Sequence, residues 1–212
     1  MKLFKAFTIF YSRRYRAILG GGLVCFLLWN VLVPLFGGSE LQQVVSTMFL
    51  ALMGILLLYG DMEVFAGIYN REGGQIASCQ SSFYGEKTIT LGVLADRITI
   101  FLWILGVGIV QFVWGKAFFP QSIWSMITGC ALVYSIVSIG VNLNRFFATT
   151  LGVMFASMVE GSLASAASLV FLLIYPVGTW WSAVLSVALA VLVTVATVLI
   201  ASHFVKRSYC DE

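Results

Sequence analysis

Long apolar runs separated by short polar breaks are the feature that most constrains this chain of 212 residues. Sixty per cent of the residues are hydrophobic and only 10% are charged, whereas a soluble domain carries about 25% charged residues. A helix needs about 20 apolar residues to cross the roughly 30 Å of hydrocarbon in a bilayer. The runs therefore predict an all-α membrane protein with six transmembrane helices, at Ile18–Phe36, Val44–Ala66, Ile98–Trp114, Ile123–Val141, Phe146–Tyr175 and Trp180–Phe204.

The basic residues fall almost entirely on one side of the membrane once these six spans are threaded in order. Of the twelve Lys and Arg residues, Lys116 alone falls on the opposite side, which leaves eleven on the first. Since Lys and Arg concentrate in cytoplasmic loops, we expect both termini in the cytoplasm and interpret the net charge of +3 as an orienting signal, with no nucleic-acid partner. Four tryptophans fall at the predicted outer boundary, where indole rings prefer to lie: Trp114, Trp124, Trp180 and Trp181.

Side chains that could carry catalysis are scarce. The four cysteines have no paired spacing and the lone His203 has no partner ligand, so we expect neither a metal site nor a disulfide framework. The string Tyr84-Gly85-Glu86-Lys87-Thr88 lacks the leading glycine of a P-loop, whose amides cradle phosphates. We therefore expect that the chain is not an enzyme and that any ATP-driven work needs a separate chain.

Two polar segments lie on the predicted cytoplasmic side. Residues 1–16 are predicted to form an amphipathic interfacial helix ahead of the transmembrane domain 17–212, and a basic tail that only orients the chain is the alternative. The polar side of this helix carries Lys5, Arg13 and Arg16, whereas Arg14 breaks the pattern. The loop 69–97 is the only connection long enough to fold and to dock on a cytoplasmic partner. Its side chains available for contacts include Glu72, Gln75, Gln80, Tyr84, Glu86 and Lys87.

The basic lead, the string Asn70-Arg71-Glu72-Gly73-Gly74 after the second span and the polar loop leading to Lys87 resemble the small permease subunits of ABC exporters for drugs, polysaccharides and peptides. The resemblance implies that residues 1–16 are the elbow helix. It also implies that Glu72 starts a coupling helix formed by Gln75 to Tyr84, which docks on an ATP-binding subunit. ATP and Mg²⁺ would bind to that partner, with no cofactor in this chain.

The same resemblance implies a multi-pass protein of the bacterial plasma membrane, surrounded by lipid and paired with a second copy or a sister permease. The short connection Pro176–Thr179 leaves little room for the reentrant helices of polysaccharide exporters. It favours export of hydrophobic or amphipathic peptides, toxins or drugs, or immunity against them. The alternative is a small transporter that works without an ATPase, or an immunity or scaffold membrane protein.

Acidic residues near the membrane call for a role, because a carboxylate in hydrocarbon costs at least about 2.5–3.5 kcal/mol. Glu160 in the fifth span either lines the translocation path and attracts cationic substrate, or lies near the inner boundary in an ion pair. Asp61 and Glu63 are expected near Arg97 as salt-bridged anchors at that boundary.

Small residues recur at helical spacing in the fifth and sixth spans. Such spacing lets helices approach closely, so we predict packing within the bundle, with a substrate path as the alternative. In the sixth span these residues are Ser182, Ser186, Ala190 and Thr194. The polar or aromatic residues Trp103, Gln111 and Asn30 are possible cavity-lining residues whose direction the sequence leaves open.

Overall fold

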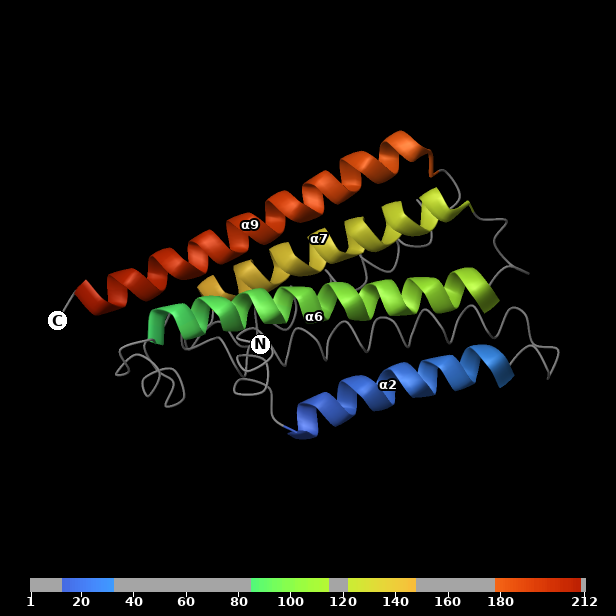
Figure 1. Ribbon diagram of the computed structural model, residues 1–212, viewed down its shortest axis with the longest axis horizontal. Helices are drawn as coiled ribbons and strands as arrows, with labels where there is room; N and C mark the ends of the chain where they lie inside the picture. Colours follow the sequence, from blue (N-terminus) through green and yellow to red (C-terminus); the bar gives the residue numbers. More distant parts are fainter. Residues whose placement is uncertain (1–12, 33–84, 115–121, 148–177, 211–212) are drawn as a thin grey trace.

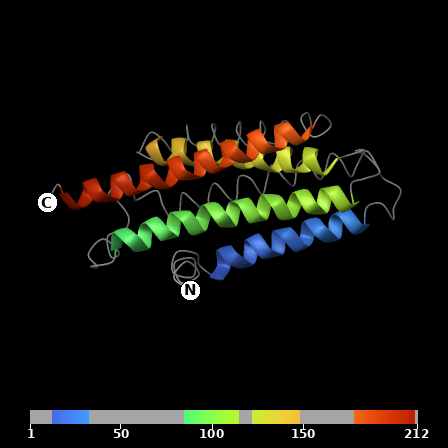
Figure 2. The ribbon, with the colours of Figure 1, turned by 45° about the horizontal axis from the view of Figure 1, so that its top comes forward.

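The computed structural model describes residues 13–32, 85–114, 122–147 and 178–210. These segments form the helices α2 (Arg13–Leu32), α6 (Gly85–Trp114), α7 (Ile123–Phe147) and α9 (Trp180–Cys210). The helices extend along the long axis of one elongated bundle (Figures 1 and 2). Within these four segments no strand occurs, which agrees with the all-α prediction.

Three of the described helices contain stretches that are long and apolar enough to cross a membrane. They are Lys87–Val110 in α6, Ile123–Asn142 in α7 and Trp180–His203 in α9, while α2 has a shorter apolar stretch, Leu19–Trp29. The protein is therefore a helical membrane protein by length and composition. The predicted second span lies outside the described residues, as does the predicted fifth span beyond Phe147, where α7 ends.

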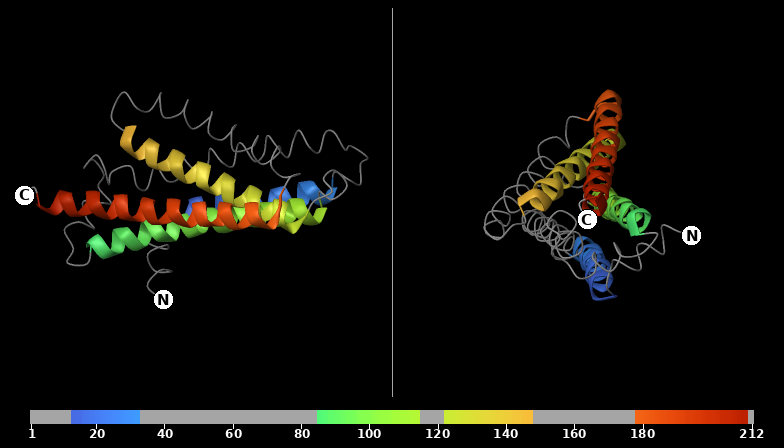
Figure 3. Two further views of the ribbon diagram at one scale, coloured as in Figure 1. Left: turned by 90° about the horizontal axis from the view of Figure 1, so that it is seen from above. Right: turned by 90° about the vertical axis from the view of Figure 1, so that its left-hand side faces the viewer.

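The helices form two parallel pairs that run in opposite directions. The indole Nε1 of Trp103 on α6 donates a hydrogen bond to the carbonyl oxygen of Leu19 on α2 at 3.3 Å. A Cβ added to Gly106, three residues further on, would meet Leu23, four residues beyond Leu19, so α2 and α6 run in the same direction. Helices α7 and α9 run together in the opposite direction (Figures 1 and 3). A six-span topology requires these directions of its first, third, fourth and sixth spans.

The two ends of the bundle differ in chemistry. One end gathers the start of α6 and the ends of α7 and α9, whereas α2 begins further in, beside the middle of α6 (Figure 1). The turns near this basic end carry Lys87, Arg145, Lys206 and Arg207. The start of α2, with Arg13, Arg14 and Arg16, lies close to the level of Arg97, because the Trp103–Leu19 bond is six residues beyond both Arg97 and Arg13. The opposite, aromatic end has Trp114, Trp124, Trp180 and Trp181 in its terminal turns. This segregation agrees with the predicted charge asymmetry.

Hydroxyl caps fix where α7 and α9 begin. The amide of Ser125 donates to the hydroxyl of Ser122 at 3.2 Å, just ahead of α7. Ahead of α9, the amide of Thr179 donates to Ser182 Oγ at 3.0 Å and the amide of Ser182 donates back to Thr179 Oγ1 at 3.4 Å. These bonds satisfy amides that a helix start leaves without partners, and both helices start at the residues predicted for their spans.

Helix α6 begins 13 residues before the predicted start of the third span at Ile98. Residues 85–97, predicted as the second part of the cytoplasmic loop, are helical instead. The physical reason is that the run from Thr88 to Ala95 is mostly apolar and contains no proline, so nothing ends the helix before the span. Its 30 residues make a rod of about 45 Å.

Helix α2 begins at Arg13, so the last residues of the predicted elbow share one helix with the first span. The sequence between Arg13 and Ala17 contains neither proline nor glycine, and nothing there favours a break. The remainder of the predicted elbow lies outside the described residues.

Helix α9 lies at the periphery of the described bundle. Only 22% of its most apolar stretch is buried, against 56% in α6 and 61% in α7. Its buried positions are all small residues at helical spacing: Ala183, Ser186, Ala190, Thr197 and Ala201. The predicted packing role of Ser186 and Ala190 is therefore confirmed, whereas the small residues of the fifth span lie outside the described residues.

Candidate functional site

The residues predicted for coupling, the elbow and the path are mostly beyond what the structure describes. Lys87 is exposed in the first turn of α6 at the basic end, and Glu86 belongs to the same turn. Arg13, Arg14 and Arg16 belong to the first turn of α2. The two helix starts lie apart, because the Trp103–Leu19 bond places Arg13 near the level of Arg97, twelve residues into α6 (Figure 1). Glu72, Gln75, Gln80, Tyr84, Lys5 and Glu160 lie outside the described residues.

A buried ion pair lies within α6. Arg97 is 0% exposed and Asp96 is 1% exposed. The guanidinium donates from Nε to Asp96 Oδ2 at 3.0 Å and from Nη2 to the same oxygen. Twelve residues separate Arg97 from the start of α6, which places it about 18 Å along the helix. Arg97 was expected beside Asp61 and Glu63, which lie outside the described residues, and in the structure it pairs with its own neighbour.

A ladder of hydrogen bonds joins α7 to α9 along most of the length of α7. At the aromatic end, the amide of Gly178 donates to Ser125 Oγ at 3.1 Å. The hydroxyls of Thr128 and Ser182 lie 3.2 Å apart. Further along, the hydroxyls of Tyr134 and Thr194 lie 2.7 Å apart, and Asn142 Nδ2 donates to Thr197 Oγ1 at 2.7 Å. We call this row of contacts the α7–α9 seam.

The ion pair and the seam meet at one level of the bundle. Phe101 on α6 packs edge-on against Tyr134 on α7, with ring centroids 5.4 Å apart. Because these helices are antiparallel, one turn toward the basic end leads from Phe101 to Arg97 and from Tyr134 to Ser138. Three helices thus contribute polar side chains to what we call the polar layer, which consists of the buried residues Asp96, Arg97, Ser138 and Thr197 and the half-buried Asn142.

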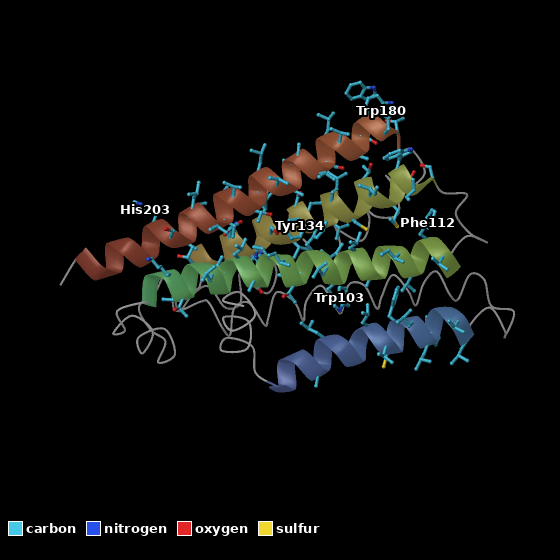
Figure 4. All side chains as sticks on the ribbon, in the orientation of Figure 1. Trp103, Phe112, Tyr134, Trp180 and His203 are labelled. Carbon is cyan, nitrogen blue, oxygen red and sulfur yellow. The ribbon has the colours of Figure 1, made fainter. Side chains whose placement is uncertain are left out.

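Trp103 has a packing role. It is 8% exposed, and its indole nitrogen bonds to the backbone of α2, as its position between α2 and α6 in Figure 4 illustrates. The possible cavity-lining role considered for this residue is therefore replaced by a contact that holds two helices together. The side chains of Gln111 and Asn30 lie outside the described part.

The polar layer offers charge and hydrogen bonding. Within residues 13–32, 85–114, 122–147 and 178–210, no three His, Cys, Asp or Glu side chains are grouped to hold a metal ion. Cys25 is exposed on α2, Cys130 is buried on α7, and His203 lies far along α9 toward the basic end (Figure 4). The chemistry this arrangement supports is the stabilisation of charge and of polar groups inside an apolar bundle.

The Asp96–Arg97 pair was not predicted as a site, although the sequence contains a signal for it. The two charges interrupt a stretch from Thr88 to Trp103 that carries no other charge and no proline. Ionisable residues bracketed in this way are typical of an intramembrane functional position. The seam gives no comparable signal, because its partners are 53 to 60 residues apart in the sequence.

Comparison of the chain with protein-family models, with curated proteins and with solved structures gives no match. Function is therefore inferred from the residue pattern and from the geometry of the bundle. The two features available for that inference are the basic end and the polar layer.

Proposed function

We propose that the chain is the permease subunit of an ATP-driven exporter that moves hydrophobic or amphipathic peptides, toxins or drugs out of the cell. The observation that carries the proposal is that four tryptophans lie at one end of the bundle, away from every basic residue of the four described helices. By the positive-inside tendency, the basic end faces the cytoplasm. Helix α6 then begins on the cytoplasmic side, directly after the segment that resembles a coupling helix.

In this proposal α6 transmits the motion of the ATPase. The residues 69–84 dock on an ATP-binding subunit, and the adjoining helix carries the displacement along a continuous rod of 30 residues. The rod reaches the polar layer at Arg97 and touches α7 closely at Gly108, where an added Cβ would overlap Cys130. Two subunits, identical or sister permeases, flank the path, since the described helices pack against one another through side chains.

Co-purification tests the proposal. With the ATP-binding subunit co-expressed, the intact chain should retain it, and the variant Glu72→Ala/Tyr84→Ala should lose it. Lys116→Ala, on the predicted outer side, is the matched control and should bind normally. Retention of the ATPase by the double variant would contradict the assigned docking surface.

The sidedness has a separate test. A variant that keeps Cys79 as its only cysteine should resist a membrane-impermeant maleimide in intact cells and react after permeabilisation. Labelling from outside would invert the orientation and remove the coupling role of the loop.

The buried Asp96–Arg97 pair favours a second function, a small transporter driven by an ion gradient, because ionisable residues inside membranes mark ion and proton paths. In that case transport would persist without any ATPase and would stop when a protonophore collapses the gradient. An ATP-driven exporter would instead lose transport without its ATPase and would keep it when a protonophore is added. Right-side-out and inside-out vesicles allow both measurements.

A further inference from the structure

Ser138 differs from every other buried hydroxyl residue in the described helices. Six serines and threonines are buried there, namely Ser125, Thr128, Ser135, Ser138, Ser186 and Thr197. Five of them make hydrogen bonds, mostly to a carbonyl one turn earlier in the same helix. Ser138 is 0% exposed, and its Oγ has no hydrogen-bond partner.

Asn142, one turn further along α7, carries a second oxygen of this kind. Its Nδ2 donates to Thr197 Oγ1 at 2.7 Å and to the carbonyl oxygen of Ser138 at 3.0 Å. Thr197 uses its own proton on the carbonyl oxygen of Val193 at 2.7 Å, so it must accept from the amide, which fixes the direction in which the amide points. Asn142 Oδ1 is then buried without a partner.

These two oxygens share one face of α7, because residues four apart lie above one another on a helix, with Cβ atoms about 5–6 Å apart. Buried polar atoms in folded proteins are bonded to protein or to ordered water. The oxygen of Asn142 can only accept a hydrogen bond, whereas the hydroxyl of Ser138 can donate or accept. A molecule that bridges them must donate at least once and fit between two adjacent turns.

We propose that Ser138 Oγ and Asn142 Oδ1 bind one buried water molecule inside the α7–α9 seam. The water donates one hydrogen bond to Asn142 Oδ1. It makes a second hydrogen bond with Ser138 Oγ, as donor or as acceptor, so that both oxygens have a partner. A monovalent cation fits less well, because the guanidinium of Arg97 lies at the same level of the bundle. Asn142 ends the apolar stretch of α7 on the side of the basic end, so the site is close to the predicted aqueous boundary from which water enters.

The sign of a stability change distinguishes a hydrated site from a dry one. If Ser138 Oγ holds a water, Ser138→Ala should lower the thermal midpoint of the full chain in lipid nanodiscs by roughly 2–4 °C. If the hydroxyl is buried dry, its removal relieves an unsatisfied group and leaves the midpoint unchanged or raised, which would overturn the proposal. Ser135→Ala is the matched control, since that hydroxyl bonds to the carbonyl of Ala131 in its own helix.

Repeating Ser138→Ala in an Asn142→Ala chain tests whether the two residues share one water. In an Asn142→Ala chain the water has already lost one anchor, so adding Ser138→Ala should change the midpoint less than it does alone. An equal loss in both backgrounds would overturn the bridge, because it would show that Ser138 acts independently of Asn142. Circular dichroism of each variant before heating confirms that it is folded.

The ligand itself is identified directly. A structure of the full chain at a resolution that shows ordered water should contain density within about 2.7–3.2 Å of both oxygens, and no density there would overturn the proposal. The midpoint should be the same in sodium chloride and in choline chloride. A rise that requires sodium would identify a cation in place of water. These outcomes are independent of transport and of any ATPase partner.

Discussion

The closest approach of α6 to α7 gives the sharpest prediction, at Gly108. A Cβ added there would lie less than 3.0 Å from Cys130 Sγ and 3.6 Å from Met126 Cγ. Cys130 is 1% exposed, so its sulfur has little space into which it can turn. We expect Gly108→Ala to push the two helices apart or to force the cysteine out of its present position.

The size of the effect follows from two opposing terms. Overpacking a well-packed core by one methyl group costs about 1–3 kcal/mol, and replacing a helical glycine by alanine returns about 0.5–1 kcal/mol. The net loss expected for Gly108→Ala is therefore about 0–2.5 kcal/mol. Gly106→Ala is the matched control on the same helix, because its Cβ would make an ordinary contact at 3.7 Å with Leu23. This control should gain about 0.5–1 kcal/mol.

Equilibrium unfolding in mixed detergent micelles measures these differences. Cys130→Ala removes the overlapping sulfur, so the double variant Gly108→Ala/Cys130→Ala should be more stable than the sum of the two single losses implies. Strict additivity would refute the reasoning, because it would mean that the two positions do not touch. A stabilising Gly108→Ala would refute it as well.

Three further predictions use the same unfolding assay. Gly178→Ala would place a Cβ against backbone atoms of Ser125, so we expect a loss of about 1–3 kcal/mol that Ser125→Ala does not rescue. Tyr134→Phe removes a hydroxyl bond to α9 and should cost about 0.6 kcal/mol, the average for an interhelical hydrogen bond in a membrane. Arg97→Met leaves a buried carboxylate without this guanidinium and should cost about 3–5 kcal/mol, whereas the double variant Asp96→Asn/Arg97→Met should cost clearly less. Rescue of Gly178→Ala by Ser125→Ala would contradict the first prediction, and an unchanged stability of Tyr134→Phe would contradict the second. The third would be contradicted if Asp96→Asn/Arg97→Met were as unstable as Arg97→Met alone.

Helix limits set by local chemistry were predictable from the sequence. Ser122 and Thr179 each precede an apolar run and supply a cap to it, so the starts of α7 and α9 agree with the predicted spans. The tryptophans likewise fall at one end of the described bundle, away from the basic residues. The caps depend on residues within a few positions of one another, which is the range that a sequence pattern reports.

The start of α6 and the polar layer were not predictable in the same way. In the sequence, the charges at Asp96 and Arg97 resemble the end of a loop. They are part of a helix because they are buried among neighbouring helices, which the sequence does not report. The bond from Asn142 to Thr197 depends on the register between two helices whose bonded residues are 55 positions apart. No local pattern specifies that register, because it is set by packing between residues far apart in the sequence.

The α7–α9 seam has a mechanical consequence for the peripheral helix. Its bonds are distributed from Gly178 to Thr197, so sliding α9 along its axis by one turn, about 5.4 Å, would rupture all of them together. Surrounding lipid offers no replacement donors or acceptors. The seam therefore opposes sliding of α9 along its axis but allows α9 to tilt together with α7. In any rearrangement of the protein, these two helices are expected to move as one rigid body.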